Sequence, residues 1–158
     1  MGAWEVTLIG GEAYLHPGFL DVVRALRRHG VRPTLTTGGR GVTPELAAQL
    51  VEAGLHSASV SIDGLESTHD LFRATRGSLQ SALSALANLR SVGITTAVNT
   101  NFNRLNVSQV DALYELVKAN GASSWMLILT VPLGRGADRP DMLLQPWDLL
   151  ELMPAFAR

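Results

Sequence analysis

The 158-residue sequence contains no cysteine. It therefore carries no disulfide, no thiol nucleophile and no thiolate ligand for zinc or for an iron–sulfur cluster within its own length. It also lacks a strong net charge, because 13 basic and 14 acidic side chains nearly cancel, which argues against a nucleic-acid partner or an anionic membrane surface. No apolar run approaches the roughly 18–20 residues of a membrane helix, and no signal-peptide pattern opens the chain. A soluble cytoplasmic protein is the expectation.

What is present suits one ordinary domain, with 46% hydrophobic residues and a mean hydropathy of +0.16. Four segments have helical periodicity, and each stops at a glycine, the residue that most easily adopts the left-handed conformation closing a last turn. The stop positions are Gly30, Gly54, Gly93 and Gly121. Thr43 before Pro44 predicts an N-cap, and Asn106 with Gln109 predicts a capping box.

Short runs rich in β-branched residues separate these helices, and they predict strands. Several are apolar on both faces, as expected for parallel strands that are covered by helices. The βα alternation demands a mostly parallel sheet and leaves two α/β architectures, a doubly wound open sheet or part of a (βα) barrel. Residues 146–158 predict the start of a further helix beyond a domain at 1–145. The expected strands are Val6–Ile9, Thr34–Thr37, Ala58–Ile62, Thr95–Thr100 and Trp125–Val131.

Polar and glycine-rich residues follow every expected strand, where the chemistry of βα proteins collects. Connecting loops are commonly polar in any case, but five such ends facing one mouth predict a binding site there. The connection Leu65–Gly77 is longer than the typical 2–6 residues, which predicts either a binding element or a short capping helix with solvated Arg73 and Arg76. The strand-end groups are Gly10-Gly11-Glu12, Thr36-Thr37-Gly38-Gly39, Ser61-Ile62-Asp63-Gly64, Asn99-Thr100-Asn101 and Pro132-Leu133-Gly134-Arg135-Gly136.

Other site types find no support. The sequence has no GxxxxGK[ST] phosphate loop and no GxSxG nucleophile elbow. Its four histidines lack the spacing of metal ligands.

Taken in order, the strand-end motifs resemble those of the radical SAM superfamily, specifically its SPASM-type peptide and cofactor maturases. Residues 7–19 resemble that family's GGE strand, with Ala13 in place of the usual proline. Residues 61–64, 69–73 and 77–79 resemble its S[IL]DG…HDxFR…GSF block, and Asn99-Thr100-Asn101 and 131–136 resemble its next two strands. The resemblance implies strands two to six of a six-stranded partial barrel. The family's CxxxCxxC loop, which binds a 4Fe–4S cluster, is absent here, so the sequence is expected to be a core fragment of a longer protein.

The resemblance also implies that S-adenosylmethionine lies across the barrel mouth. Backbone at Gly10 and Gly11 would approach the methionyl amine, and Glu12 would help orient the ligand. Arg73 would pair with the carboxylate, with Arg76 as the competing candidate. Thr36 or Thr37, Ser61 and Asp63 would bond the ribose or the carboxylate, Asn99 would reach the ribose or adenine, and backbone near Gly134 would border the adenine.

The implied function is the cofactor-binding core of an enzyme that forms a 5′-deoxyadenosyl radical and modifies a peptide or cofactor precursor. Without cluster cysteines, this chain alone is expected to be inactive and to bind S-adenosylmethionine weakly. Two alternatives remain: a degenerate, non-catalytic α/β binding domain, and an unrelated doubly wound nucleotide- or phosphate-binding domain. Because no strand is expected beyond Val6–Ile9, this edge also predicts self-association.

Overall fold

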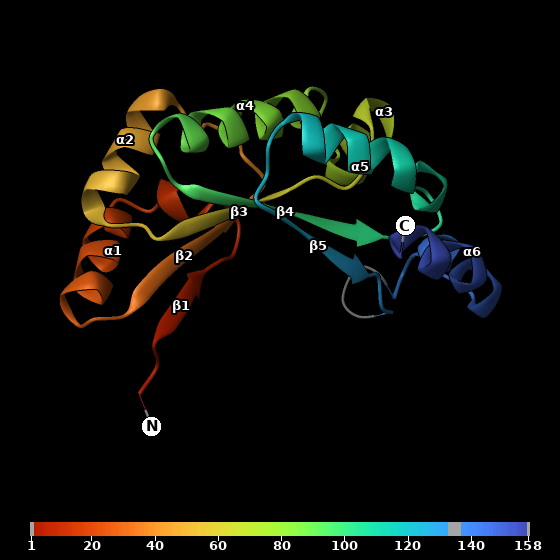
Figure 1. The fold of residues 1–158 in the computed structure, drawn as a ribbon, viewed down its shortest axis with the longest axis horizontal. Coiled ribbons are helices and arrows are strands. Elements are labelled where there is room, and N and C mark those ends of the chain that lie inside the picture. The colour runs from red at the N-terminus through yellow and green to blue at the C-terminus, as the bar shows by residue number, and fades with distance from the viewer. Residues whose placement is uncertain (1, 133–136, 158) are drawn as a thin grey trace.

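The computed structural model describes residues 2–132 and 137–157. Helices and strands alternate along most of the chain, as the spacing of stop signals predicts (Figure 1). The strands are β1 (Glu5–Leu8), β2 (Arg32–Thr37), β3 (Ser57–Ser61), β4 (Thr95–Phe102) and β5 (Ser124–Leu129). The helices are α1 (Phe19–Arg28), α2 (Pro44–Ala53), α3 (Glu66–Arg73), α4 (Ser78–Ser91), α5 (Val110–Ala119) and α6 (Pro146–Phe156), with 3-10 turns η1 (Ala13–Leu15), η2 (Val107–Gln109) and η4 (Pro140–Met142).

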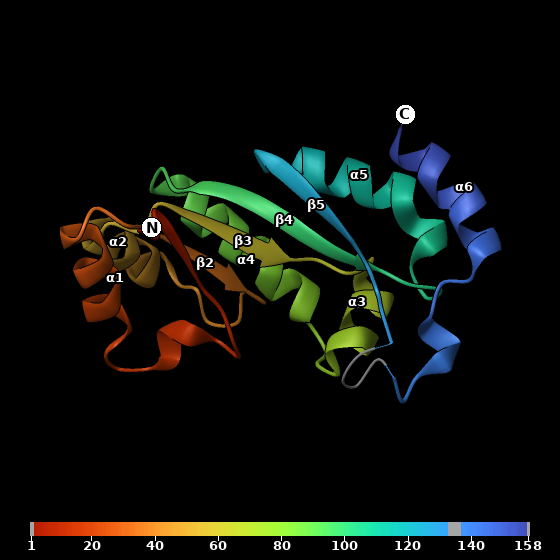
Figure 2. The ribbon, with the colours of Figure 1, turned by 90° about the horizontal axis from the view of Figure 1, so that it is seen from below.

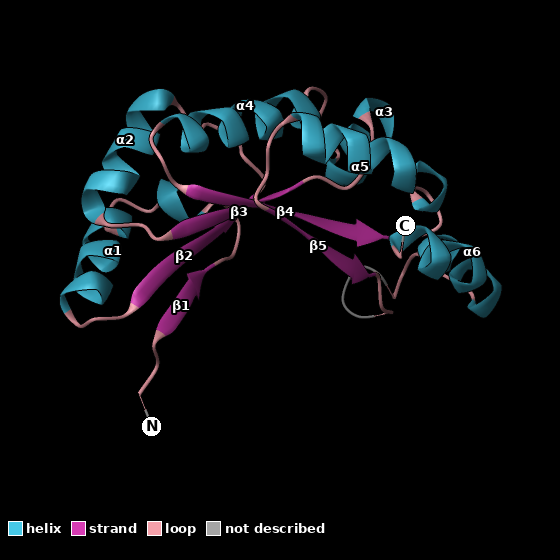
Figure 3. Cartoon of the chain, in the orientation of Figure 1, coloured by secondary structure: helices cyan, strands magenta, loops and turns pink. Residues whose placement is uncertain are grey.

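All five strands are parallel and lie in chain order, β1-β2-β3-β4-β5. Helices α1, α2, α4 and α5 cover one face of the curved sheet, and the opposite, concave face carries none of them (Figures 1 and 3). A doubly wound domain reverses its strand order and places helices on both faces. The fold is therefore a partial (βα) barrel, and the doubly wound alternative is wrong.

Local signals set most helix ends correctly. The Thr43 side chain accepts a hydrogen bond from the Leu46 N–H, with Pro44 in the first turn, and all four predicted stop glycines have positive φ. The capping box at Asn106 and Gln109 is wrong. Turn η2 lies between Asn106 and α5, and both side chains bond other parts of the chain instead.

The two faces of the sheet differ sharply in chemistry. Side chains under the helices are buried, including Leu35, Val60 and Val98. On β2 to β4 the concave face carries mainly Ser, Thr and Asn, because residues paired in parallel register point to the same side. Only β5 is apolar on both faces, with Met126 and Ile128 on the concave side. Strands apolar on both faces are therefore fewer than expected. A closed barrel fills its interior with bulky branched residues, whereas this sheet leaves a polar trough.

At the far end of the sheet, α6 lies beside α5 (Figure 2). The ring centroids of Phe156 on α6 and Phe102 at the end of β4 are 5.0 Å apart, and Leu152 is almost fully buried. The helix expected from residue 146 therefore lies against the barrel core. No helix of the described residues is long and apolar enough to span a membrane.

Candidate functional site at the carboxyl ends of the strands

Asp63, two residues after β3, is the buried centre of the candidate site. Its side chain is fully buried and both carboxylate oxygens have protein partners. Oδ1 accepts a 2.9 Å hydrogen bond from the Asn101 N–H, and Oδ2 forms an ion pair with Nη2 of Arg73. The charge of Asp63 thus holds the guanidinium in place and ties the end of β3 to β4.

The long connection after β3 folds into α3, which lies beyond the carboxyl ends of β3 and β4 (Figure 2). The segment forms the expected short helix, but Arg73 is not solvated as that prediction required, and the prediction of a binding element stays open. Arg73 is partly buried against Asp63, whereas Arg76 lies beyond the helix and is exposed. The structure therefore brings Arg73, and not Arg76, to Asp63.

His69 lies on α3 one turn before Arg73 and is almost fully buried. Its Nδ1 accepts a 2.9 Å hydrogen bond from the Asp63 N–H. Burial lowers the pKa of His69, because water no longer solvates the cation. The charges of Asp63 and Asp70 oppose this shift, and that of Arg73 adds to it.

Asp70 performs a different task on the same helix. Its carboxylate accepts hydrogen bonds from the Gly77 and Leu79 N–H groups and from the Ser78 hydroxyl. These bonds satisfy the free donors at the start of α4, and the Gly77 bond is the main cause of a lowered Asp70 pKa. Asp70 therefore fixes where α4 begins relative to α3.

Asn106 is hydrogen-bonded to the main chain at Asp63. It is fully buried, and its Nδ2 donates to the main-chain oxygens of Asp63 and Asn101, at 2.7 and 2.9 Å. Its Oδ1 accepts from the Asn103 N–H. Nearby, Gln109 accepts from the Leu65 N–H. These bonds fix the positions of the chain segments that follow β3 and β4.

A second polar cluster joins the end of β1 to β2. The Thr37 hydroxyl donates to Glu12 Oε2, and the Tyr14 hydroxyl donates to the Arg40 main-chain oxygen. Glu12 also accepts from the Arg40 N–H at 3.3 Å. Burial raises the pKa of Tyr14 well above its ordinary value. Glu12 and Thr37 are therefore engaged with each other in this structure.

The remaining predicted residues lie on or beside the concave face. Ser61 pairs with Asn99 in the sheet register, and Thr36 pairs with Ser59 on the same face. Gly10 and Gly11 are exposed just after β1, and a Cβ added at either one would meet no atom within 4 Å. Gly134 lies outside the described residues. The structure therefore gathers these predicted residues into two groups, one beside β1 and β2 and one beside β3 and β4.

Two buried polar atoms of the site have no hydrogen-bond partner within the described residues. They are the acceptor Asn99 Oδ1 and the donor Arg73 Nε. Buried polar groups in folded proteins nearly always have a partner. Within the described residues, Asn99 Oδ1 can therefore still accept a hydrogen bond and Arg73 Nε can still donate one.

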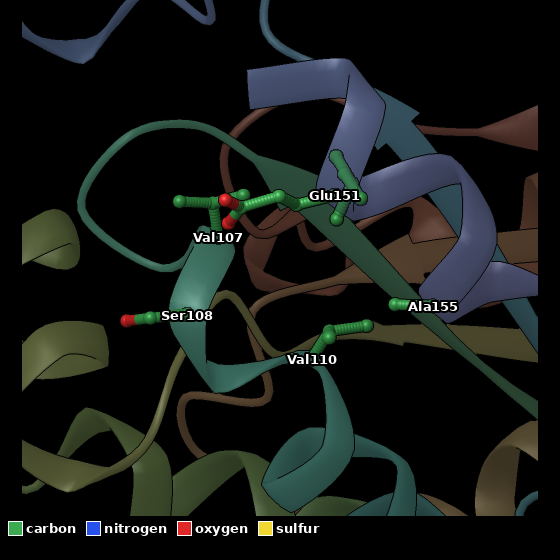
Figure 4. A pocket seen from close by; sticks show the side chains of 6 residues that line it. Val107, Ser108, Val110, Glu151 and Ala155 are labelled. Atoms are coloured by element: carbon green, nitrogen blue, oxygen red, sulfur yellow. The ribbon is translucent and has the colours of Figure 1, made fainter. Parts of the chain in front are cut away.

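Other features of the described residues lie apart from this site. A cavity of about 400 Å³ lies between η2 and α6, lined by Val107, Ser108, Val110, Glu151, Leu152 and Ala155 (Figure 4). None of the predicted site residues lines it. In the part of the chain that the structure describes, no group of three or more His, Cys, Asp or Glu side chains is placed to hold a metal ion.

Sequence reasoning did not assign the roles of His69, Asn106 and Tyr14. The sequence motifs include His69 without a role, predict only a helix cap at Asn106 and give Tyr14 no role. The signal that could have identified these residues is a polar side chain within an otherwise apolar stretch of sequence. Each of these side chains is polar and buried, and such groups are retained where they make specific bonds.

Comparison with known proteins gives consistent matches. A family model described as the Radical SAM superfamily matches residues 1–117. An AdoMet-dependent heme synthase of Methanosarcina barkeri is 33% identical over 136 residues, covering 85% of this chain and 39% of the relative. A mycofactocin maturase of Mycolicibacterium smegmatis is 34% identical over 145 residues, covering 90% and 36%. The chain thus spans well under half the length of these curated relatives.

Solved structures agree on the fold. The structure of anSMEcpe with bound AdoMet superposes with a TM-score of 0.81 at 18% identity, covering 99% of this chain and 44% of the other. A domain of a pyruvate-formate lyase-activating enzyme from Bacteroides vulgatus gives a TM-score of 0.70 at 12% identity, covering 98% and 96%. At these identities the likeness concerns the fold alone.

Proposed function

This chain belongs to the radical SAM superfamily, and on that premise we propose that it binds S-adenosylmethionine across the carboxyl ends of β1 to β4. The family uses S-adenosylmethionine together with a 4Fe–4S cluster. The ligand carries an ammonium group, a carboxylate, ribose hydroxyls and an adenine. The candidate site must therefore offer both hydrogen-bond acceptors and a cationic donor.

The observation that carries the proposal is the pair of unpartnered atoms, Asn99 Oδ1 and Arg73 Nε. The Asn99 amide oxygen suits a ribose hydroxyl or the adenine amine, and the Arg73 guanidinium suits a carboxylate because it donates in parallel. The ion pair with Asp63 still leaves Arg73 Nε free to donate. This arrangement favours Arg73 over the exposed Arg76 as the carboxylate partner.

The other predicted contacts divide into direct and indirect roles. Gly10 and Gly11 leave open space where side chains would stand, so a ligand amine has access to the backbone. Thr36 and Ser61 present hydroxyls on the concave face. Glu12 and Thr37 bond each other, and buried Asp63 bonds Arg73 and Asn101 with its two oxygens, so we assign these three to orienting the loops.

The 4Fe–4S cluster does not fit the residues of this chain. The chain has no cysteine to supply thiolates, and the described residues hold no alternative group of ligands. We therefore assign this chain the cofactor-binding part of a radical enzyme that acts on a peptide or cofactor precursor. We expect the chain alone to be inactive in reductive cleavage of S-adenosylmethionine and to bind it weakly.

Equilibrium dialysis with labelled S-adenosylmethionine tests the proposal. Arg73→Ala and Asn99→Ala should each weaken binding about tenfold, the effect of losing one good polar contact. Arg76→Ala is the matched control and should leave binding unchanged. Equal binding by all three variants, or no binding by the natural chain at millimolar ligand, contradicts the assignment.

A non-catalytic binding domain is the second candidate, and the absence of cysteine favours it. Anaerobic incubation with S-adenosylmethionine and dithionite tests whether the chain alone can cleave the ligand. Formation of 5′-deoxyadenosine by the isolated chain with reconstituted iron and sulfide would overturn our expectation that the chain is inactive. Binding without cleavage agrees with both candidates, and iron analysis of the protein purified from its source then decides between them.

We also propose that β1 is a contact edge. Among the described residues β1 pairs only with β2, and Trp4 and Ile9 beside it are 66% and 70% exposed. An unpaired strand edge with apolar neighbours favours pairing between chains. Light scattering from micromolar to millimolar concentration should show a rising mass, and a constant monomer mass contradicts this proposal.

A further inference from the structure

Helix α3 contacts Asp63 at two points. His69 and Arg73 are four residues apart and therefore lie on the same side of the helix. His69 Nδ1 accepts from the main-chain N–H of Asp63, and Arg73 Nη2 pairs with its side-chain Oδ2. We call this arrangement of His69, Arg73 and Asp63 the α3 clamp. The His69 contact fixes the main chain at Asp63, just after β3, and the Arg73 contact fixes the Asp63 carboxylate.

The backbone contact defines the state of the imidazole. A main-chain N–H can only donate, so Nδ1 of His69 must carry a lone pair and the ring proton must be on Nε2. Protonation of Nδ1 would place two donors face to face at 2.9 Å. The cationic form of His69 is therefore incompatible with this hydrogen bond.

Three charged groups act on His69 from the elements around it. Asp63 follows β3, and Asp70 and Arg73 lie on α3 itself. The two carboxylates favour the cation, whereas Arg73 and burial favour the neutral ring. Burial is the largest influence, and it lowers the pKa of His69. The neutral acceptor required by the clamp is thus the form that the surroundings favour.

We propose that His69 is a positioning residue that holds Asp63, and through it the Arg73 guanidinium, in place only while its imidazole is neutral. Protonation of His69 at low pH therefore releases the main chain at Asp63, and the Arg73 guanidinium loses its fixed position. The binding arm of the test below rests on the proposed function, because it assumes that Arg73 contacts the ligand carboxylate. The structural arm does not depend on that assumption.

The structural arm uses nuclear magnetic resonance on the full 158-residue chain without ligand. The ring nitrogens of His69 should show the Nε2–H tautomer at neutral pH, and the Asp63 amide should exchange slowly. His69→Asn retains an acceptor at the same place, because its Oδ1 corresponds to Nδ1, and should keep the Asp63 amide protected. His69→Ala should accelerate Asp63 exchange about tenfold or more and shift the Arg73 guanidinium signals. The matched control is His56→Asn, because His56 is exposed. It should change neither the exchange of the Asp63 amide nor the Arg73 signals.

The binding arm measures S-adenosylmethionine affinity from pH 8 down to the lowest pH at which the chain stays folded. Because burial lowers the pKa of His69, the affinity of the natural chain should stay constant down to the ordinary histidine pKa and should fall about tenfold only at lower pH, as His69 becomes protonated. His69→Asn should bind like the natural chain at pH 8 and stay constant as the pH falls. His69→Ala should bind weakly throughout. A merely structural histidine would not give a pH dependence that asparagine removes.

Each arm has a result that overturns the clamp. A proton on Nδ1 of His69 at neutral pH, or unchanged Asp63 and Arg73 signals in His69→Ala, refutes it directly. An acid dependence that persists in His69→Asn also refutes it. If the natural chain binds no S-adenosylmethionine at any pH while the structural arm gives the expected signals, the proposed function fails and the clamp stands.

Discussion

The side-chain Nδ2 of Asn106 donates a 2.7 Å hydrogen bond to the main-chain oxygen of Asp63, 43 positions earlier in the chain. The same nitrogen reaches the main-chain oxygen of Asn101. One buried amide thus joins the segments that follow β3 and β4. Buried hydrogen-bond networks of this kind specify a unique arrangement, because removing one member leaves several groups without partners.

We expect Asn106→Ala to destabilise the fold by about 2–4 kcal/mol, because the main-chain oxygen of Asp63 and the N–H of Asn103 lose their bonds to this side chain and the oxygen of Asn101 is left with the bond from Asn103 Nδ2. Urea unfolding measures the change in free energy. Asn120→Ala is the control, because the Asn120 side chain makes one local bond to the Leu116 main-chain oxygen, and its cost should be clearly smaller. Equal losses in the free energy of unfolding would show that the hydrogen bonds of Asn106 stabilise the fold no more than the single local bond of Asn120.

Two buried threonines of β4 provide a matched pair. Thr100 Oγ1 donates to the Ile62 main-chain oxygen and accepts from the Trp125 indole. Thr96 is equally buried, yet its Oγ1 has no partner among the residues described. Thr100→Val should cost about 1–3 kcal/mol, whereas Thr96→Val should be neutral or stabilising, because it removes an unsatisfied hydroxyl. Thermal or urea unfolding of both variants checks this order, and the reverse order contradicts the bonding pattern.

The cap that Asp70 places on α4 predicts an acid-sensitive helix start. Since folding lowers the pKa of Asp70, its stabilisation is complete above the ordinary carboxyl value and is lost as the pH falls through the folded-state value. Asp70→Ala should lower Tm by about 2–4 °C at neutral pH, the usual effect of a lost cap in a domain of this size. Amide exchange at Gly77 and Leu79 should then be fast at every pH. Exchange that is unchanged from the natural chain would contradict the cap.

The buried phenol of Tyr14 predicts a delayed alkaline titration. Burial raises the pKa of Tyr14 above its ordinary value, because the phenolate would lose solvation. Phenolate absorbance of the folded chain should therefore rise over a wider pH range than that of the chain unfolded in urea. Tyr14→Phe should remove the late component. If the late component persists in that variant, Tyr14 is not its source.

Local sequence signals were sufficient for the five strands and for most helix ends, but not for the start of α5. A glycine with positive φ ends a helix through its own backbone freedom, as at Gly54, and a threonine before a proline caps one, as at Thr43. Such effects depend on a few neighbouring residues. The ordered strand-end motifs predicted the family in the same way, because they are continuous in the chain.

Tertiary structure decided which side chains remain free to bind. Asp63 and Glu12 follow their strands just as the prediction requires, but the first is buried and bonds Arg73 and Asn101, and the second bonds Thr37. Asn99, on the concave face, keeps its acceptor free of protein partners within the described residues. The partners are fixed by strand register and by the placement of α3, which join residues far apart in sequence. The sequence by itself determined most strands and helices and the order of the motifs through local backbone chemistry, whereas only the folded sheet decided which of these polar groups bond each other and which keep a free donor or acceptor.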